Sequence, residues 1–241
     1  MTAAPDDFTE ASYRELLRLT AAQYAICGYR EPAAGPHAIL RHDLDASLQR
    51  ALALARIESE EGVQATYFVF PRCLYYNLLH PDSKRVVDEI LSLGHRLALH
   101  FDVSMDHAPE DLQRLVQFEK ALIEHEFGRP AEAVSFHLAG DFRSRLPQED
   151  EVCGMVNAYS ARMAGEYRYV SDSNGVWRFE PWLRLIDAVR HPRLHILTHP
   201  EWWTPGPLTP RQRLQRAIDG YARRMGAWYD ETTRKSNRPN Y

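Results

Sequence analysis

The feature that most constrains the fold is a regular alternation of short apolar segments with amphipathic helical patterns. The expected strands lie at residues 38–43, 66–70, 96–100, 133–137 and 194–198, with only short strands between 146 and 171. The expected helices lie at residues 12–25, 48–61, 83–93, 109–127, 182–189 and 210–228. Strands that alternate with helices form parallel βαβ units, so the pattern predicts an α/β protein whose sheet closes, or nearly closes, into a barrel. An open doubly wound sheet is the alternative, but no strand is followed by the glycine-rich loop of its nucleotide-binding forms.

The length of 241 residues suits a single domain with its own hydrophobic core. We expect residues 1–35 to hold an N-terminal helix that packs on the barrel, and residues 36–229 to form the barrel itself. Residues 230–241, which read DETTRKSNRPNY, are expected to form a polar tail.

Composition argues against several classes of protein. The formal net charge of −4 gives no electrostatic reason to expect binding to nucleic acid. The sequence lacks the run of about 20 apolar residues that a membrane span requires. The start, MTAAPDDFTEASYRELL, does not resemble a secretory signal, so a cytoplasmic location is expected. The three cysteines are far apart and form no CxxC pair, which argues against a disulfide framework or a cysteine-rich zinc site.

Acidic and histidine side chains gather at the carboxyl ends of the expected strands. They are Asp43 and Asp45, His100 and Asp102, His137, and His199. The carboxyl ends of barrel strands converge on one face, so these side chains should surround one site. Carboxylate and imidazole groups are ligands of catalytic zinc, and a second carboxylate close to the metal can serve as general base. The pattern therefore predicts a divalent metal, most readily Zn²⁺.

The order of the motifs also resembles a known family. RHDLD, ATYFV, LGHRLALHFD, SFH, VSDSNGVW and ILTHPEWW follow one another over residues 38–203. This order is similar to that of the polysaccharide deacetylase (NodB-homology) superfamily, carbohydrate esterase family 4, and most of all to its divergent branch with HDxD in place of TFDDG. The resemblance implies a deformed TIM-like (β/α)₇ barrel, a divalent metal that is usually zinc, and hydrolysis of an N-acyl group on an amino sugar.

The resemblance also implies roles for individual residues. Asp43 corresponds to the catalytic base and Asp45 to the metal-binding aspartate. His100 corresponds to the first metal-binding histidine. His199, in the motif LxxH, corresponds to the general acid that protonates the leaving amine.

The third metal ligand departs from the family pattern. The family has a second metal-binding histidine four residues after the first, where this chain has Ser104. The arginine of the family's RxPxG motif is absent, and HDxD places one extra residue between the two carboxylates. Asp102 shares a strand face with His100, whereas His137 follows the neighbouring strand, so both are candidates for the third ligand.

Four further residues are expected to contact the substrate. Asp172 and Trp177 match the family motif that lines the site and orients the acid. Trp202 follows the acid, where a tryptophan either stacks on a sugar or caps the core. Arg41 is expected to pair with Asp43 or Asp102, or to bind an anionic sugar or a diphosphate.

These features together predict a metal-dependent amidohydrolase that acts on linear C–N amide bonds, removing an acetyl or formyl group from an amino sugar or glycan intermediate. The expected partner is a sugar or glycan, in small or lipid-linked form. One alternative is an acyl-transfer enzyme of surface-glycan synthesis on the same scaffold. The other is a catalytically inactive carbohydrate-binding protein.

Overall fold

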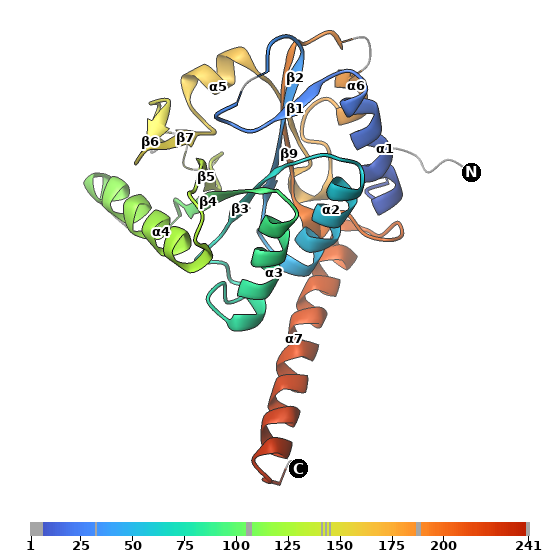
Figure 1. Ribbon diagram of the computed structural model, residues 1–241, viewed down its shortest axis with the longest axis vertical. Helices are drawn as coiled ribbons and strands as arrows, with labels where there is room; N and C mark the ends of the chain where they lie inside the picture. The colour runs from blue at the N-terminus through green and yellow to red at the C-terminus, as the bar shows by residue number, and fades with distance from the viewer. Residues whose placement is uncertain are drawn as a thin grey trace.

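A curled and mostly parallel sheet forms the centre of the molecule, with helices packed around it (Figure 1). The computed structural model describes residues 7–31, 33–104, 108–140, 142, 144, 146–186 and 189–239. The strands are β1 (Ala25–Cys27), β2 (His37–Asp43), β3 (Thr66–Val69), β4 (Arg96–Asp102), β5 (Ala133–His137), β6 (Glu151–Val152), β7 (Met155–Asn157), β8 (Arg168–Ser171) and β9 (Arg193–Thr198). The helices are α1 (Glu10–Ala21), α2 (Leu48–Glu60), α3 (Pro81–Ser92), α4 (Leu112–Phe127), α5 (Ala161–Glu166), α6 (Trp182–Ile186) and α7 (Pro210–Lys235). Two short 3₁₀ turns, η3 (Ser173–Gly175) and η5 (Pro200–Trp202), follow β8 and β9.

The strands lie in the order β6-β7-β5-β4-β3-β2-β9-β8, and all neighbours are parallel except β6 and β7. Parallel strands present their carboxyl ends at one edge, so the ends of β2, β4, β5 and β9 meet there. Among the described residues, no ladder joins β8 to β6 or β7, which leaves the barrel incompletely closed. The expectation of a deformed TIM-like barrel in a single domain is confirmed.

The strand β1 is absent from the sequence prediction. It pairs with the first half of β2, from Ala25 opposite His37 to Cys27 opposite Ile39. The strand β3 pairs with the second half of β2, so β1 and β3 share one edge of that strand. The segment before residue 36 therefore adds a strand to the sheet as well as the expected helix.

Several helices begin or end away from the predicted positions. The helix α1 begins at Glu10, because the side chain of Thr9 caps it by accepting a hydrogen bond from the Ser12 amide. The helix α7 begins as predicted, with Thr209 and Gln212 forming a capping box, but continues to Lys235 and projects from the body (Figure 1). Part of the expected polar tail is therefore helical. The helix predicted over 182–189 ends at Ile186, and residues 187 and 188 lie outside the described part of the chain.

A buried polar cluster joins α1 and α2 to the sheet. The Glu58 carboxylate on α2 lies 2.6 Å from His42 Nε2 and accepts hydrogen bonds from the hydroxyls of Tyr13 and Tyr67. Burial opposes ionisation of Glu58, but His42 and His95 outweigh it and lower the pKa of the carboxyl. His42 therefore faces the helices, as expected from its position between residues 41 and 43, and takes no part in the cluster at the strand ends.

Among the described helices, none is long and apolar enough to cross a lipid bilayer.

His195 on β9 makes the stability of the fold depend on pH. Its Nε2 lies 2.6 Å from the hydroxyl of Tyr29, and burial, assisted by Arg41, lowers its pKa to about 3. Between about pH 6.5 and pH 3, the unfolded chain binds a proton at this histidine and the folded chain does not. We therefore expect acidification through this window to reduce the free energy of unfolding by up to ~5 kcal/mol. Denaturant unfolding at pH 7 and pH 5 should show a smaller pH dependence for His195→Gln than for the unaltered chain, and equal dependences would contradict the assignment.

Candidate active site

One cavity lies at the carboxyl ends of the strands and has a volume of about 860 Å³. The candidate side chains that line it are Asp43, Asp45, His100, His137, His199 and Trp202. They come from β2, β4, β5 and β9 and from the residues that directly follow β2 and β9. The parallel sheet thus brings together the acids and histidines that the sequence places at strand ends.

Three of these residues form a cluster with the donor set of a metal site. Asp45, His100 and His137 each offer one ligand atom, and these atoms lie within 4.8 Å of one another. His100 Nε2 lies 3.1 Å from Asp45 Oδ1, and His137 Nδ1 lies 3.6 Å from Asp45 Oδ2. Asp45 Oδ1 and His100 Nε2 are buried and have no hydrogen-bond partner among the described residues. Buried polar atoms without partners call for an ion or a water, so this cluster fits a divalent cation.

Of the two candidates for the third ligand, the geometry favours His137. The side chain of Asp102 accepts hydrogen bonds from the backbone amide of Ser104, at 2.9 Å, and from its hydroxyl, at 2.7 Å. These bonds hold the Asp102 carboxylate in the turn after β4, whereas His137 lies beside Asp45. Burial acts against protonation of His137, but Asp45 outweighs it and raises the pKa of this imidazole.

A buried arginine holds the candidate base in place. Arg41 donates to both oxygens of Asp43, with Nε 2.8 Å from Oδ1 and Nη2 2.5 Å from Oδ2. Its guanidinium lies 5.0 Å from the centres of the rings of Phe68 and Tyr159. Burial favours the neutral form of Asp43, but Arg41 and His100 outweigh it and lower the pKa of the carboxyl. Arg41 is 0% exposed and pairs with Asp43, which is one of the partners that the sequence offered for it.

Ser135 on β5 connects the candidate base to the cluster of Asp45, His100 and His137, and it was not identified from the sequence. It pairs with His100 across the β4–β5 ladder, and its Oγ lies 2.7 Å from His100 Nδ1. The Ser135 hydroxyl also donates a hydrogen bond to Asp43 Oδ1, at 3.4 Å. These contacts turn His100 Nε2 towards Asp45, as outer hydrogen bonds do for metal-binding histidines. The available signal was the motif SFH, because side chains two apart on a strand share a face.

The candidate acid is held by a fully buried carboxylate. Asp172 Oδ1 lies 2.6 Å from His199 Nδ1, and the same carboxylate accepts the backbone amide of His199 at 3.0 Å. Trp203 Nε1 donates to the other oxygen at 2.9 Å. Burial acts against a charged imidazole, but Asp172 outweighs it and raises the pKa of His199 to about 10. His199 is therefore protonated at neutral pH, and its Nε2 lies 3.7 Å from Asp45 Oδ2.

Comparison with known proteins identifies similar solved structures. No protein-family model matches the sequence, and no curated protein sequence matches it. One similar structure is a carbohydrate esterase family 4 pseudoenzyme from Bacillus anthracis, with 15% identity over 78% of this chain and 60% of that chain, and a TM-score of 0.43. Another is the catalytic domain of a peptidoglycan N-acetylglucosamine deacetylase from Eubacterium rectale, with 16% identity over 86% of this chain and 91% of that chain, and a TM-score of 0.44. A third is a deacetylase from Streptococcus pyogenes in complex with acetate, with 14% identity over 88% of this chain and 85% of that chain, and a TM-score of 0.44.

One of these three structures is described as a member of carbohydrate esterase family 4. This is the family that the order of the sequence motifs indicates. The chain covers less than two thirds of the Bacillus anthracis pseudoenzyme. The similarity concerns the fold, and the roles given to individual residues rest on the geometry of the cavity.

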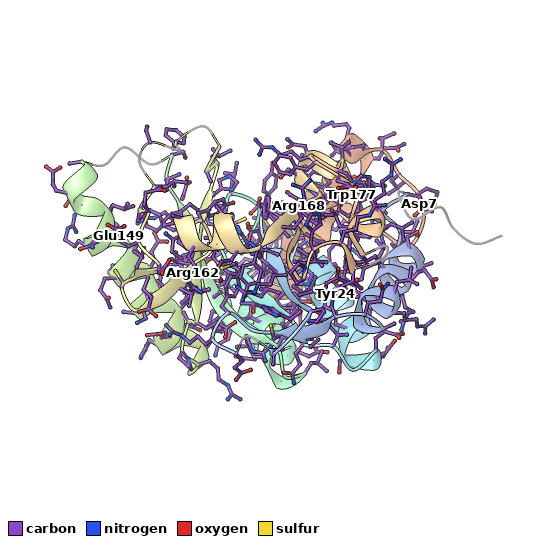
Figure 2. The ribbon with its side chains drawn as sticks, turned by 90° about the horizontal axis from the view of Figure 1, so that it is seen from above. Asp7, Tyr24, Glu149, Arg162, Arg168 and Trp177 are labelled. Atoms are coloured by element: carbon purple, nitrogen blue, oxygen red, sulfur yellow. The ribbon has the colours of Figure 1, made fainter. Side chains whose placement is uncertain are left out.

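The two tryptophans and the aspartate of the expected family 4 motifs lie in different surroundings. Trp202 lines the cavity, and its buried Nε1 has no hydrogen-bond partner among the described residues. Trp177 is on the same side of the molecule as Asp7 (Figure 2), and it stacks on Phe8 with ring centres 5.1 Å apart. Asp172 is 0% exposed, so it contacts His199 and not a substrate. Trp202 is therefore the one of these residues that is placed to meet a ligand.

Proposed function

We propose that this chain is a metal-dependent carbohydrate deacetylase that hydrolyses an N-acyl group of an amino sugar. The observation that carries the proposal is the meeting of Asp45, His100 and His137 around two buried atoms without a hydrogen bond, Asp45 Oδ1 and His100 Nε2, which lie 3.1 Å apart. An ionised carboxylate, Asp43, and a protonated imidazole, His199, flank this cluster. Hydrolysis of an amide needs these two groups, one to accept a proton and one to give a proton.

Asp45, His100 and His137 would hold the metal, which we propose to be Zn²⁺. Three protein ligands of this kind are typical of catalytic zinc. When bound, the ion would lower the pKa of a water molecule and polarise the acyl carbonyl. Ser135 supports this arrangement, because its contact with His100 Nδ1 leaves His100 Nε2 free to bind.

The remaining chemistry follows from the residues around the cluster. Asp43 accepts a proton from the attacking water, while Arg41 keeps its carboxylate ionised and fixed in orientation. The C–N bond of the amide then breaks, and His199 donates its Nε2 proton to the leaving nitrogen. Asp172 holds the opposite ring nitrogen, so the donated proton points into the cavity. The products are a carboxylate and a free amino sugar.

The proposed substrate is a small or lipid-linked amino sugar that carries an acetyl or formyl group. The cavity volume of about 860 Å³ suits a small ligand. Trp202 would present its Nε1–H to an oxygen of the sugar or the acyl group, as tryptophan commonly does at binding sites. We include a location in the cytoplasm in the same proposal.

The proposal is tested by product analysis. The purified protein, loaded with Zn²⁺, is incubated with N-acetyl and N-formyl amino sugars, and free carboxylate and free amine are measured. We expect both products in equal amounts, with a loss of about 10²–10⁴-fold in kcat for Asp43→Asn at unchanged metal content. Transfer of the acyl group to an added sugar acceptor would instead identify an acyl transferase. Sugar binding without turnover, equal in the protein and in Asp43→Asn, would identify a carbohydrate-binding protein.

A further inference from the structure

A second cavity lies between α2, η5 and α7 and has a volume of about 180 Å³. This volume is several times the ~30 Å³ that one water molecule occupies. Its lining shares no residue with the lining of the catalytic cavity. Five arginines border it: Arg50, Arg213, Arg216, Arg223 and Arg224. We call it the arginine cavity.

The positive charge of the arginine cavity is only partly balanced. Glu201 is the single carboxylate in the lining. Arg50 forms an ion pair with Glu10, outside the lining, at 2.6 Å. Among the described residues, Arg216, Arg223 and Arg224 form no ion pair with any carboxylate. Burial, with a smaller contribution from Arg216, lowers the pKa of Arg50 despite its ion pair.

One of these arginines is buried with an unused donor. Arg213 is 4% exposed, and its Nη2 donates to the backbone oxygen of Asp7 at 2.8 Å. Its Nε is buried and has no hydrogen-bond partner among the described residues. A buried donor without a partner is costly, and Arg213 is one of the residues that border the arginine cavity.

The sequence of α7 explains why the arginines converge. Residues 213, 216, 220 and 223 lie three or four apart in turn, and residue 224 lies four after 220, so all of them share one side of the helix. Gly220 has no side chain, and the guanidinium groups of Arg224 and Arg223 lie 3.7 and 3.9 Å from the position that a Cβ would occupy there. The opposite wall is the beginning of α2, which Ser47 caps. Helix starts carry partial positive charge and so add to the attraction for an anion.

We propose that the arginine cavity binds a phosphate or diphosphate group of a phosphorylated ligand. Guanidinium groups pair with phosphate oxygens through two parallel hydrogen bonds, and several of them together compensate its two charges. Two kinds of ligand carry such a phosphate group: a soluble phosphate ester and a lipid with a phosphate headgroup. The proposal does not depend on deacetylase activity, because the two cavities are lined by different residues.

The experiment measures binding of inorganic pyrophosphate by calorimetry at constant ionic strength, with chloride as the reference anion. We expect saturable binding that Arg216→Gln and Arg223→Gln each weaken about tenfold, which corresponds to about 1.4 kcal/mol. Arg211→Gln is the matched control, because this substitution also removes one positive charge from α7. Arg211 donates a hydrogen bond to Gln215 and lies outside the lining of the arginine cavity. This control should bind pyrophosphate as the unaltered protein does.

A second arm distinguishes the source of the phosphate. Co-sedimentation compares vesicles of phosphatidylcholine with vesicles that also contain phosphatidic acid. Binding to phosphatidic acid alone, with loss in Arg216→Gln, would support a lipid phosphate as the ligand, whereas binding of pyrophosphate alone would support a soluble ester. Absence of both, or equal weakening by Arg211→Gln and Arg216→Gln, would overturn the proposal. Neither result depends on whether an acyl group is released from an amino sugar.

Discussion

Replacing Asp45 with alanine is expected to remove the metal from the purified protein. Asp45 lies next to both His100 and His137, so its loss leaves two imidazoles without the negative charge that neutralises part of the cation. A residue that only hydrogen-bonds to a metal ligand contributes about 10–100-fold to metal affinity. Loss of a residue that binds the metal directly should therefore weaken metal binding by more than about 100-fold. Metal content is measured by elemental analysis after dialysis against a weak chelator. Full occupancy in Asp45→Ala would contradict the ligand assignment.

Two further variants identify the third ligand. His137→Ala should lose the metal as Asp45→Ala does, because His137 belongs to the same cluster. Asp102→Ala is the matched control and should keep the metal, because its carboxylate binds Ser104. Retention of metal by His137→Ala, together with its loss from Asp102→Ala, would assign the ligand to Asp102 instead. Circular dichroism of each variant shows whether the fold is kept.

Replacing Asp172 with asparagine is expected to shift the alkaline side of the pH–rate profile to lower pH. Asp172 raises the pKa of His199 to about 10 against the effect of burial. Without that negative charge, the pKa falls to the ordinary value of about 6.5 or below, and His199 loses its proton at neutral pH. Since only protonated His199 can act as the acid, kcat/KM at pH 8 should fall about 30-fold or more, while the loss at pH 6 should be small. The measurement is kcat/KM from pH 6 to pH 11.

The control for this prediction keeps the charge of Asp172 and removes one of its neighbours. Trp203→Phe deletes the indole that donates to Asp172 Oδ2, but leaves the contact between Asp172 and His199. Its alkaline limb should therefore stay close to that of the unaltered protein. An alkaline limb that is the same in Asp172→Asn and in the unaltered protein would exclude His199 as the acid.

The central strands could be predicted because their signal is local. Residues 133–137 and 194–198 are short segments in which three of five residues are apolar, and the structure has strands at Ala133–His137 and Arg193–Thr198. The strand β1 escaped prediction, because three residues, Ala25–Cys27, are too few to show a period and their strand conformation depends on pairing with β2. The end of α7 was placed too early, because its last turns are polar and carry no apolar pattern.

The candidate site also contains some residues that the sequence could predict and others that it could not. The residues at strand ends, such as Asp45 and His100, were recognisable because the barrel fixes where strand ends meet. The partners that orient them were harder to find, because they depend on distances across the fold. Arg41 stands two residues from Asp43, yet the sequence left open whether it pairs with Asp43 or with a ligand, and its complete burial favours pairing with Asp43. Glu58 resembles an ordinary polar residue of a helix, although it is buried against two histidines.

The distribution of the three proposed ligands over the sheet has a consequence for the stability of the fold. Asp45 follows β2, His100 lies in β4 and His137 ends β5, so no single βα unit of the chain contains more than one of them. An unfolded chain therefore offers isolated donors in place of a chelate, so binding of the cation would be linked to folding of the sheet. Chelation of the metal would then lower the midpoint of global unfolding, even though each ligand lies at the open end of its strand.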